Sequence, residues 1–325
     1  MLTLLFFSFL AEIDLAPNAT WDENGISIAG WENGTNGTSP SQLNAPVALA
    51  ISKDDVLCVA DTSNHRIVII YLGSTTPNQI IGGYGSGPNQ YSYPYDCFPT
   101  NSSLYITDAG NRRIQQQLLL NVSNATNTFS LIGSASPFYL FVDNNQNIYY
   151  SSYLSHTVTL VRANSSNMTI VAGTDGVYGS NDTQFSEPYG IFVDQVESMY
   201  VADCRNHRIM KWYQGASTGI RVAGNGISGS SSTQLDSPTD IIVDTNEYMY
   251  ISESGNARIT RWAPNSTFGV CIAACHGMSG STPTQLHGPH SLAFDSQGSL
   301  YVTDWANNRV QKFPILNYYS TYSVL

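Results

Sequence analysis

Short hydrophobic runs of four to six residues alternate with polar turns along most of the chain. Typical runs are Gly190–Asp194, Met199–Ala202 and Ile209–Trp212, which are rich in β-branched and aromatic residues and bounded by turn-forming residues. This length and composition are typical of β-strands. No window sustains the 3.6-residue period of an amphipathic helix. The pattern therefore predicts an all-β protein built from short antiparallel strands.

One phrase recurs and sets the spacing of these runs. It consists of a small residue, an acidic residue, two further residues, Asn, any residue, Arg and a β-branched residue. A degenerate copy at residues 151–158 lacks the acidic residue and the Arg; the clear copies lie at residues 60–67, 107–114, 202–209, 252–259 and 303–310. The mean period is about 49 residues, and each period holds four predicted strands.

Six repeats of four short strands are typical of a six-bladed β-propeller. We expect it to occupy residues 20–313 as a single domain. The last repeat has no obvious fourth strand after it, whereas residues 26–29 have the fourth-strand pattern and precede the first repeat. This N-terminal strand is expected to join the last blade and close the ring, because pairing removes two exposed sheet edges. Residues 314–325 then form a C-terminal tail.

The acidic residue and the Arg of each phrase are the first candidate site residues. Because they recur around the ring, and an active site needs one copy, we predict charge-assisted hydrogen bonds that fix the turns and join the blades. A calcium site or a catalytic carboxylate is the alternative. The Asn is expected to provide a left-handed or Asx turn. The predicted pairs are Asp61 with Arg66, Asp108 with Arg113, Asp203 with Arg208, Glu253 with Arg258, and Asp304 with Arg309.

The segments Asn64–Ile67 and Asn206–Ile209 resemble the NHL repeat, which is named for an Asn-His-Leu signature. The resemblance covers about residues 20–313 and implies a six-bladed propeller of NHL type. It does not imply one function, because such propellers occur in an amidating lyase, in receptors, in bacterial sensor kinases and in RNA-binding proteins. The chain most resembles secreted NHL-repeat proteins rich in Asn, Ser and Thr from small invertebrates such as bdelloid rotifers.

The charge balance narrows the functional classes. Only 11% of the residues are charged, and 13 Lys and Arg stand against 24 Asp and Glu, for a net charge of −11. This disfavours a phosphate-neutralising face for nucleic acid and electrostatic docking on an anionic membrane. The 42% of hydrophobic residues can form a sizeable core, which argues against disorder. No segment of the sequence is long and apolar enough to serve as a membrane anchor.

Two features predict a secreted glycoprotein. Residues 2–11 form an apolar run too short to span a bilayer, so residues 1–11 are interpreted as a signal peptide; a wrong start of the gene model is the alternative. Glycosylation sequons occur about twice as often as composition alone would give. They lie at Asn18, Asn33, Asn36, Asn101, Asn121, Asn124, Asn164, Asn167, Asn181 and Asn265.

The five cysteines form no CxxC pair, so a zinc ribbon or thioredoxin-type motif is absent from the sequence. Cys271 and Cys275 are a candidate disulfide, provided that the chain turns between them, because an extended strand would hold them too far apart. The odd count leaves at least one thiol unpaired or paired with another chain.

Ligands of propellers gather at one mouth of the central channel, and we expect the mouth where the innermost strands begin. The residues after the recurrent Pro are Val47, Tyr95, Phe138, Tyr189, Thr239 and His290, followed by Asp96, Tyr139, Asp240 and Ser291 among others. Channel filling by these side chains is the alternative to a site. The predicted ligand-binding residues are Tyr95, Asp96, Phe138, Tyr189, Asp240 and His290.

Resemblance to known enzymes does not supply a catalytic site. The amidating lyase holds zinc through His residues that follow Pro on three inner strands, and here only His290 does so. Sugar-lactone hydrolases bind calcium through inner-strand Glu, Asn and Asp, and Asp96 and Asp240 are too few for this. We therefore predict no metal, no cofactor and no catalysis: a secreted propeller that binds a protein or a glycan, with its oligomeric state open. The alternative is a metal-dependent lyase or lactonase-like hydrolase acting at the mouth around His290, Asp96 and Asp240.

Overall fold

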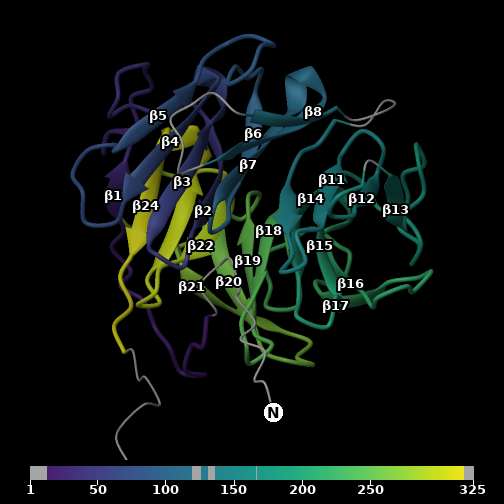
Figure 1. Ribbon diagram of the computed structural model, residues 1–325. Coiled ribbons are helices and arrows are strands. Elements are labelled where there is room, and N and C mark those ends of the chain that lie inside the picture. The colour runs from purple at the N-terminus through teal and green to yellow at the C-terminus, as the bar shows by residue number, and fades with distance from the viewer. Residues whose placement is uncertain (1–12, 119–125, 131–135, 166, 318–325) are drawn as a thin grey trace, which may run out of the picture.

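The computed structural model describes residues 13–118, 126–130, 136–165 and 167–317, whose strands form six four-stranded antiparallel sheets. The sheets are arranged as the blades of a propeller (Figure 1). The predictions of an all-β fold and of six blades are therefore confirmed. The predicted signal peptide at residues 1–11 and the tail beyond residue 317 lie outside the described residues. Among the described residues, no helix has the length and apolar character needed to cross a membrane.

The first three blades follow one another along the chain, each running outward from the channel. Blade 1 consists of β2 (Pro46–Ile51), β3 (Val56–Asp61), β4 (Arg66–Tyr71) and β5 (Gln79–Gly82). Blade 2 consists of β6 (Pro94–Pro99), β7 (Ser103–Asp108), β8 (Arg113–Leu118) and β9 (Thr126–Ser130). Blade 3 consists of β10 (Leu140–Val142), β11 (Ile148–Ser152), β12 (Thr157–Val161) and β13 (Met168–Gly173).

The last blade takes its outermost strand from the other end of the sequence. Blade 4 consists of β14 (Pro188–Val193), β15 (Met199–Asp203), β16 (Arg208–Trp212) and β17 (Ile220–Ala223). Blade 5 consists of β18 (Pro238–Val243), β19 (Met249–Glu253), β20 (Arg258–Trp262) and β21 (Gly269–Ala273). Blade 6 consists of β22 (Pro289–Phe294), β23 (Leu300–Asp304), β24 (Arg309–Phe313) and β1 (Ile26–Ala29). Ile26 pairs with Lys312, so the predicted closure by the N-terminal strand is confirmed.

The innermost strands contact each other around the channel, as β2 does with both β6 and β22. They all run the same way, so the ring has two distinct faces. We call the face where they begin the turn face, because the turns of the recurrent phrase lie beside it: Pro46 at the start of β2 pairs with Asp61 of the first turn. We call the opposite face, where β2 and its equivalents end in short hairpins such as Ser52–Asp55, the hairpin face.

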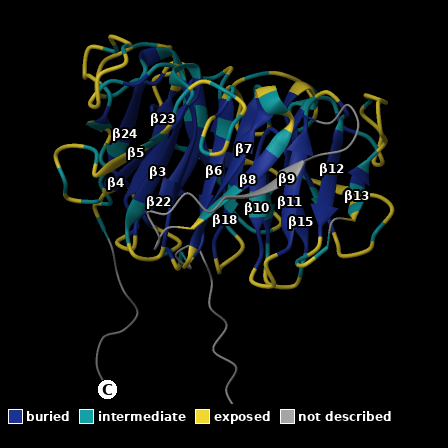
Figure 2. Ribbon diagram, turned by 45° about the horizontal axis from the view of Figure 1, so that its top comes forward, coloured by how far each residue is buried: buried dark blue, intermediate teal, exposed yellow. Residues whose placement is uncertain are grey.

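The hydrophobic core lies between neighbouring blades. Leu49, Leu57 and Val68 of blade 1, for example, pack with Ala293 and Tyr301 of blade 6. Figure 2 shows that the strands are largely buried and that exposed residues concentrate in the loops of the two faces. Because each blade buries its apolar side chains only against its neighbours, closing the ring completes the core.

Candidate functional site

We call the recurrent sequence of residues 60–67 and its equivalents the turn phrase. Each acidic residue and Arg that were predicted to pair within it form an ion pair in the structure. The Arg66 Nε lies 2.6 Å from Asp61 Oδ2, and the carboxylate side chain of Asp61 is fully buried. The other four pairs have the same geometry, at 2.7 Å for Arg113, Arg208 and Arg309 with their Asp partners and 3.0 Å for Arg258 with Glu253. A buried carboxylate without its partner would carry a large desolvation cost, so each pair holds its turn in one conformation.

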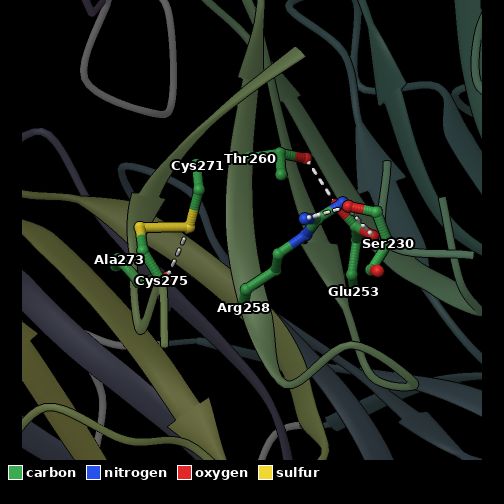
Figure 3. Close-up of a disulfide and its surroundings, with 7 residues drawn as sticks. All are labelled: Ser230, Glu253, Arg258, Thr260, Cys271, Ala273 and Cys275. Atoms are coloured by element: carbon green, nitrogen blue, oxygen red, sulfur yellow. Dashed lines mark hydrogen bonds and ion pairs between the residues drawn. A yellow bond between two sulfur atoms is a disulfide. The ribbon is translucent and has the colours of Figure 1, made fainter. Parts of the chain in front are cut away.

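The guanidinium groups also fasten the loops that lead into each blade. Arg309 donates to the carbonyls of Ser281, Thr282 and Gln285, which belong to the loop between blades 5 and 6. In Figure 3, Arg258 reaches both Glu253 and the Ser230 carbonyl in the same way. Every guanidinium nitrogen of Arg66, Arg258 and Arg309 donates a hydrogen bond within the fold, which gives the turn phrase a structural role.

The left-handed residue of the turn is the one after the Asn, which corrects the expectation for the Asn. His65, His207 and Asn308 have φ values of 56°, 50° and 50°. The preceding Asn instead lies in a short 3-10 helix, such as η1 (Thr62–Asn64), because its amide is needed to bond the turn carboxylate. The His65 Nδ1 accepts the Tyr93 N–H at 3.0 Å, so this position links one blade to the next.

A disulfide joins Cys271 of β21 to Cys275, with a Cα–Cα distance of 5.7 Å (Figure 3). The chain turns at Ala274, which has a φ of 53°. The bond therefore closes a tight turn at the outer edge of blade 5. Cys58, Cys97 and Cys204 are buried and carry free thiols.

The predicted mouth on the turn face is filled with side chains. The ring of Phe138 lies 4.2 Å from that of Tyr95 and 4.5 Å from that of Tyr189, and Tyr189 stacks on His290 at 6.2 Å. Val47 is buried in the same cluster. Thr239 is buried as well, and its hydroxyl bonds the Ser252 hydroxyl and the Pro289 carbonyl. This mouth therefore corresponds to the channel-filling alternative.

Tyr139 closes the channel below this aromatic cluster. Its hydroxyl crosses from blade 3 to blade 6 and donates to the His290 carbonyl at 2.9 Å. Burial raises the pKa of the Tyr139 phenol, so the group stays neutral and remains a donor. The side chain thus separates the turn face from the space on its other side.

A cavity of about 450 Å³ begins at Tyr139 and extends toward the hairpin face. The rings of Phe98, Phe141 and Phe192 form one wall, with centroids 5.2 Å and 5.5 Å apart. The equivalent positions of blades 6 and 1 carry Ala293 and Ala50, and these small side chains leave room opposite the Phe wall. Pockets of this size with mostly apolar walls are typical ligand sites.

Asp96 and Asp240 lie at the closed end of this cavity, so two of the six predicted ligand-binding residues line it. Tyr139 and Ser291, which follow the same Pro in other blades, line it as well. The remaining predicted residues belong to the filled turn face and do not contact the cavity. Asp96 and Asp240 come from blades 2 and 5, which stand opposite each other in a ring of six.

Neutral donors hold both carboxylates in place. Asp96 accepts the N–H groups of Leu140 and Cys97, each at 2.8 Å. Asp240 accepts the Ser291 hydroxyl at 2.7 Å, together with peptide N–H groups of its own blade and the next. The pairing register of β18 shifts between Pro238 and Asp240, and such a bulge changes the direction of the side chains that follow it.

Burial makes these two carboxylates hard to ionise. It raises the pKa of Asp96 to about 7, and the nearby charge of Asp240 adds to the shift. Burial likewise raises the pKa of Asp240 to about 7, although the hydrogen bond from Ser291 opposes the shift. Within the described residues, no Lys, Arg or His forms an ion pair with either group.

The rim of the cavity is also acidic. Asp143, Asp194, Asp244 and Glu247 line it near the hairpin face, beside Ile13 of the N-terminal segment. The first three carboxylates accept N–H groups of their own hairpins, so part of their role is structural. Sequence reasoning did not include them. The Asp that follows the innermost strands of blades 3, 4 and 5 was the signal that could have found Asp143, Asp194 and Asp244.

The side chains do not form a recognisable metal centre. Among the residues that the structure describes, no three His, Cys, Asp or Glu side chains converge in a way that could hold a metal ion. Burial lowers the pKa of His290 to about 4, so its imidazole is neutral, and its buried Nδ1 has no hydrogen-bond partner in the described part of the chain. Among the described residues, His290 belongs to no group of three ligating side chains, as a zinc site would require.

Comparison of the sequence with family models finds the NHL repeat at residues 43–70 and 286–313. These segments cover the first three strands of blades 1 and 6. NHL repeats are thus present, and together with the six-bladed fold they support the NHL propeller family. None of the curated protein sequences matches the chain.

Solved structures of similar shape include both binding proteins and enzymes. An auxiliary nutrient binding protein from Bacteroides thetaiotaomicron VPI-5482 has a TM-score of 0.69 at 14% identity, with 92% of this chain and 78% of that one covered. A gluconolactonase from Xanthomonas campestris has a TM-score of 0.60 at 14% identity, covering 94% and 99%. A virginiamycin B lyase from Staphylococcus aureus has 0.57 at 11% identity, covering 90% and 98%. At these identities the likeness establishes the fold alone.

Proposed function

We propose that this NHL-repeat propeller is a ligand-binding protein that acts outside the cell, without catalysis, and takes its ligand into the cavity at the hairpin face. The observation that carries the proposal is the cavity itself, which combines apolar walls with a few oriented polar groups at its closed end. Its walls suit an apolar ligand, or an apolar part of a protein ligand, better than a hydroxyl-rich glycan. The nutrient-binding propeller of similar fold is consistent with such a role.

The sequon positions support the extracellular part of the proposal. Eight of the ten sequon asparagines lie in the described residues, and all eight are exposed: Asn18, Asn33, Asn36, Asn101, Asn164, Asn167, Asn181 and Asn265. Asn121 and Asn124 lie outside the described residues. Each exposed side chain is accessible to a glycosylating enzyme. A closer kinship with secreted invertebrate NHL proteins is part of the same proposal.

The alternative is a metal-dependent lyase or lactonase-like hydrolase. Enzymes of both kinds share the fold, but their presence among the similar structures transfers no residue to this chain. No third ligating side chain joins Asp96 and Asp240 among the described residues, which favours binding over metal ligation. Calcium-dependent hydrolysis of gluconolactone by the purified protein would favour the alternative instead.

Binding of a neutral apolar probe tests the proposal. We expect 1-octanol to bind the full-length protein in titration calorimetry with one site per chain. Ala293→Leu adds carbons at the cavity wall and is expected to weaken this binding about tenfold or more. Ala263→Leu makes the same change in an outer loop that does not line the cavity and serves as the control. Equal octanol affinity in both variants, or no binding by the wild type, would reject the cavity as the site.

A further inference from the structure

The charges that line the cavity are all of one sign. Among the described residues, the lining includes six carboxylates and no Lys, Arg or His: Asp96, Asp143, Asp194, Asp240, Asp244 and Glu247. Field lines from like charges concentrate in a concave site with low-dielectric walls, which raises the local concentration of cations and repels anions. This arrangement selects the sign of the ligand before any contact is made.

The two carboxylates at the closed end lack any counter-ion of their own. The hydrogen bonds that Asp96 and Asp240 accept come from peptide N–H groups and a hydroxyl, not from a cation. In the turn phrases of the same molecule, by contrast, every buried carboxylate has an Arg partner. A buried carboxylate is best stabilised by a charge of opposite sign, and only a ligand can supply one at the closed end of the cavity.

The walls define the remainder of the ligand. Between the closed end and the rim, the cavity is bounded by Phe98, Phe141, Phe192 and aliphatic side chains from the other blades. An apolar body gains by leaving water along this wall, and aromatic faces are also compatible with a nearby cation. A volume of about 450 Å³ admits an alkyl chain or an aromatic ring system.

We propose that the cavity binds an organic ammonium ion, with its cationic head between Asp96 and Asp240 and its apolar body along the Phe wall. This inference rests on the proposed function and specifies its ligand class. The rim carboxylates steer the cation inward, and Tyr139 prevents it from passing to the turn face. The aromatic residues of the turn face have no part in binding.

Three probes with one apolar body separate the contributions of charge and of apolar surface. Octylammonium chloride, 1-octanol and sodium octanoate are titrated into the full-length protein at pH 8. Octylammonium is expected to bind about tenfold or more tightly than octanol, and octanoate is expected to give no measurable binding. Equal affinities for octylammonium and octanol would overturn the ammonium proposal while leaving the binding function intact. If no octyl compound binds, both are wrong.

Variants locate the ammonium group. Asp240→Asn and Asp96→Asn are each expected to weaken octylammonium binding about fivefold or more relative to octanol binding by the same variant. Glu23→Gln removes the same charge from an exposed position outside the cavity and is the matched control. Unchanged octylammonium affinity in both Asn variants would overturn the placement of the cationic head. Should either variant fail to fold, the wild-type probe series decides alone.

A second observation carries an independent inference. The thiols of Cys58 in β3 and Cys97 in β6 belong to neighbouring blades, yet their sulfur atoms lie 2.8 Å apart in a fully buried cluster. Cys204 has no such neighbour and is the odd thiol of the chain. Two thiols this close are placed to react with each other rather than with solvent.

We infer that Cys58 and Cys97 form a disulfide between blades 1 and 2 when the chain folds in an oxidising compartment. The two thiols lose two protons and two electrons, and a sulfur–sulfur bond forms between them. The electrons reduce a disulfide oxidant, such as glutathione disulfide, to two thiols. The bond would tie the first full blade to the second.

Peptide mapping of secreted full-length protein tests this inference. The protein is denatured and alkylated without reductant, digested and analysed by mass spectrometry. We expect Cys204 to be alkylated and the peptides of Cys58 and Cys97 to be found cross-linked, two hydrogens lighter than their sum. Alkylation of Cys58 and Cys97 to the same extent as Cys204 would overturn the inference.

Discussion

The two mouths of the channel are built from adjacent residues of the same six strands, yet rings pack across one and a cavity opens at the other. At the turn face, the rings of Tyr95, Phe138 and Tyr189 pack against one another across the mouth. A few residues further along the same strands, Ala50 and Ala293 stand opposite a Phe wall and leave a cavity. The comparison teaches that side-chain volume, layer by layer along the channel, decides where a propeller binds.

The two faces also treat charge differently. The turn face pairs each of its buried turn carboxylates with an Arg. In the part of the cavity lining that the structure describes, by contrast, six carboxylates have one basic partner, Lys211, which lies 3.9 Å from Asp194. The first arrangement stabilises the fold, and the second costs stability that a cationic ligand can recover. The four predictions below follow this contrast, from the largest expected effect to the smallest.

Breaking the partition between the mouths should have the largest effect. Tyr139→Ala removes a buried ring from the centre of the molecule and is expected to lower the free energy of unfolding by about 3–5 kcal/mol. Tyr139→Phe loses only the hydrogen bond to the His290 carbonyl and should cost about 1 kcal/mol. Urea denaturation measures both. A loss below 1 kcal/mol for Tyr139→Ala would show that the ring is not a packed partition.

Loss of a turn-face cation should cost more than loss of a cavity anion. Arg309→Met leaves Asp304 buried without a charge partner and is expected to cost about 3 kcal/mol, because broken buried pairs cost several kcal/mol. Asp194→Asn at the cavity rim should change the stability by less than about 1 kcal/mol. The same urea titration compares them, and a reversed order would contradict the structural role of the turn phrase.

The closed end of the cavity should make stability fall as the pH rises. Burial raises the pKa values of Asp96 and Asp240 to about 7, so the folded state holds protons that the unfolded state releases above about pH 4. Stability is then lost as the pH rises through 7. Asp96 and Asp240 face each other and the phenol of Tyr139, which is neutral. Asp244 at the rim also titrates nearby, because burial raises its pKa to about 6.

Asp240→Asn isolates the pH-dependent contribution of Asp240 to the free energy of unfolding, because the Asn side chain resembles the protonated acid. The gain in stability of the variant over the wild type should be on the order of 2 kcal/mol larger at pH 8 than at pH 5, because the wild type loses stability from about pH 4, where the unfolded carboxyl ionises, up to about pH 7. Thermal unfolding at the two pH values checks it. A gain that is the same at both pH values would mean that the Asp240 carboxylate does not titrate as proposed.

Removing a rim charge should have the smallest effect. Glu247→Gln is expected to slow the association of octylammonium about twofold at low salt, with little change in its dissociation rate. The difference should disappear at high ionic strength because exposed charges are screened. Stopped-flow kinetics at two salt concentrations measure both rates, and a change confined to dissociation would place Glu247 in contact with the bound ligand.

The sequence predicted the fold well because each copy of the repeat corresponds to one blade. The copies of the turn phrase and their spacing predicted the number of blades. The fourth-strand pattern of residues 26–29 predicted the strand that closes the ring. The ion pairs of the turns were also predictable, since Asp and Arg recur at fixed spacing within one hairpin. The left-handed position was not, because Asn64 and its equivalents use their side chains to bond the turn carboxylate.

The candidate site was predicted only in part, for a physical reason. Asp96 and Asp240 were identified, but the choice of the open mouth depends on how side chains from six distant segments fill one space. Phe138 and Tyr139 are adjacent in sequence, yet one fills the turn face and the other forms the end of the cavity. Likewise, the approach of Cys58 to Cys97 requires the packing of two blades and has no signature in spacing.

A crystal structure of the full-length protein with octylammonium tests the central claim most directly. The account predicts electron density in the hairpin-face cavity, with the nitrogen beside the carboxylates of Asp96 and Asp240 and the chain against Phe141. Density at the turn face beside Tyr95 and Tyr189 would contradict it, as would a cavity that stays empty at saturating ligand.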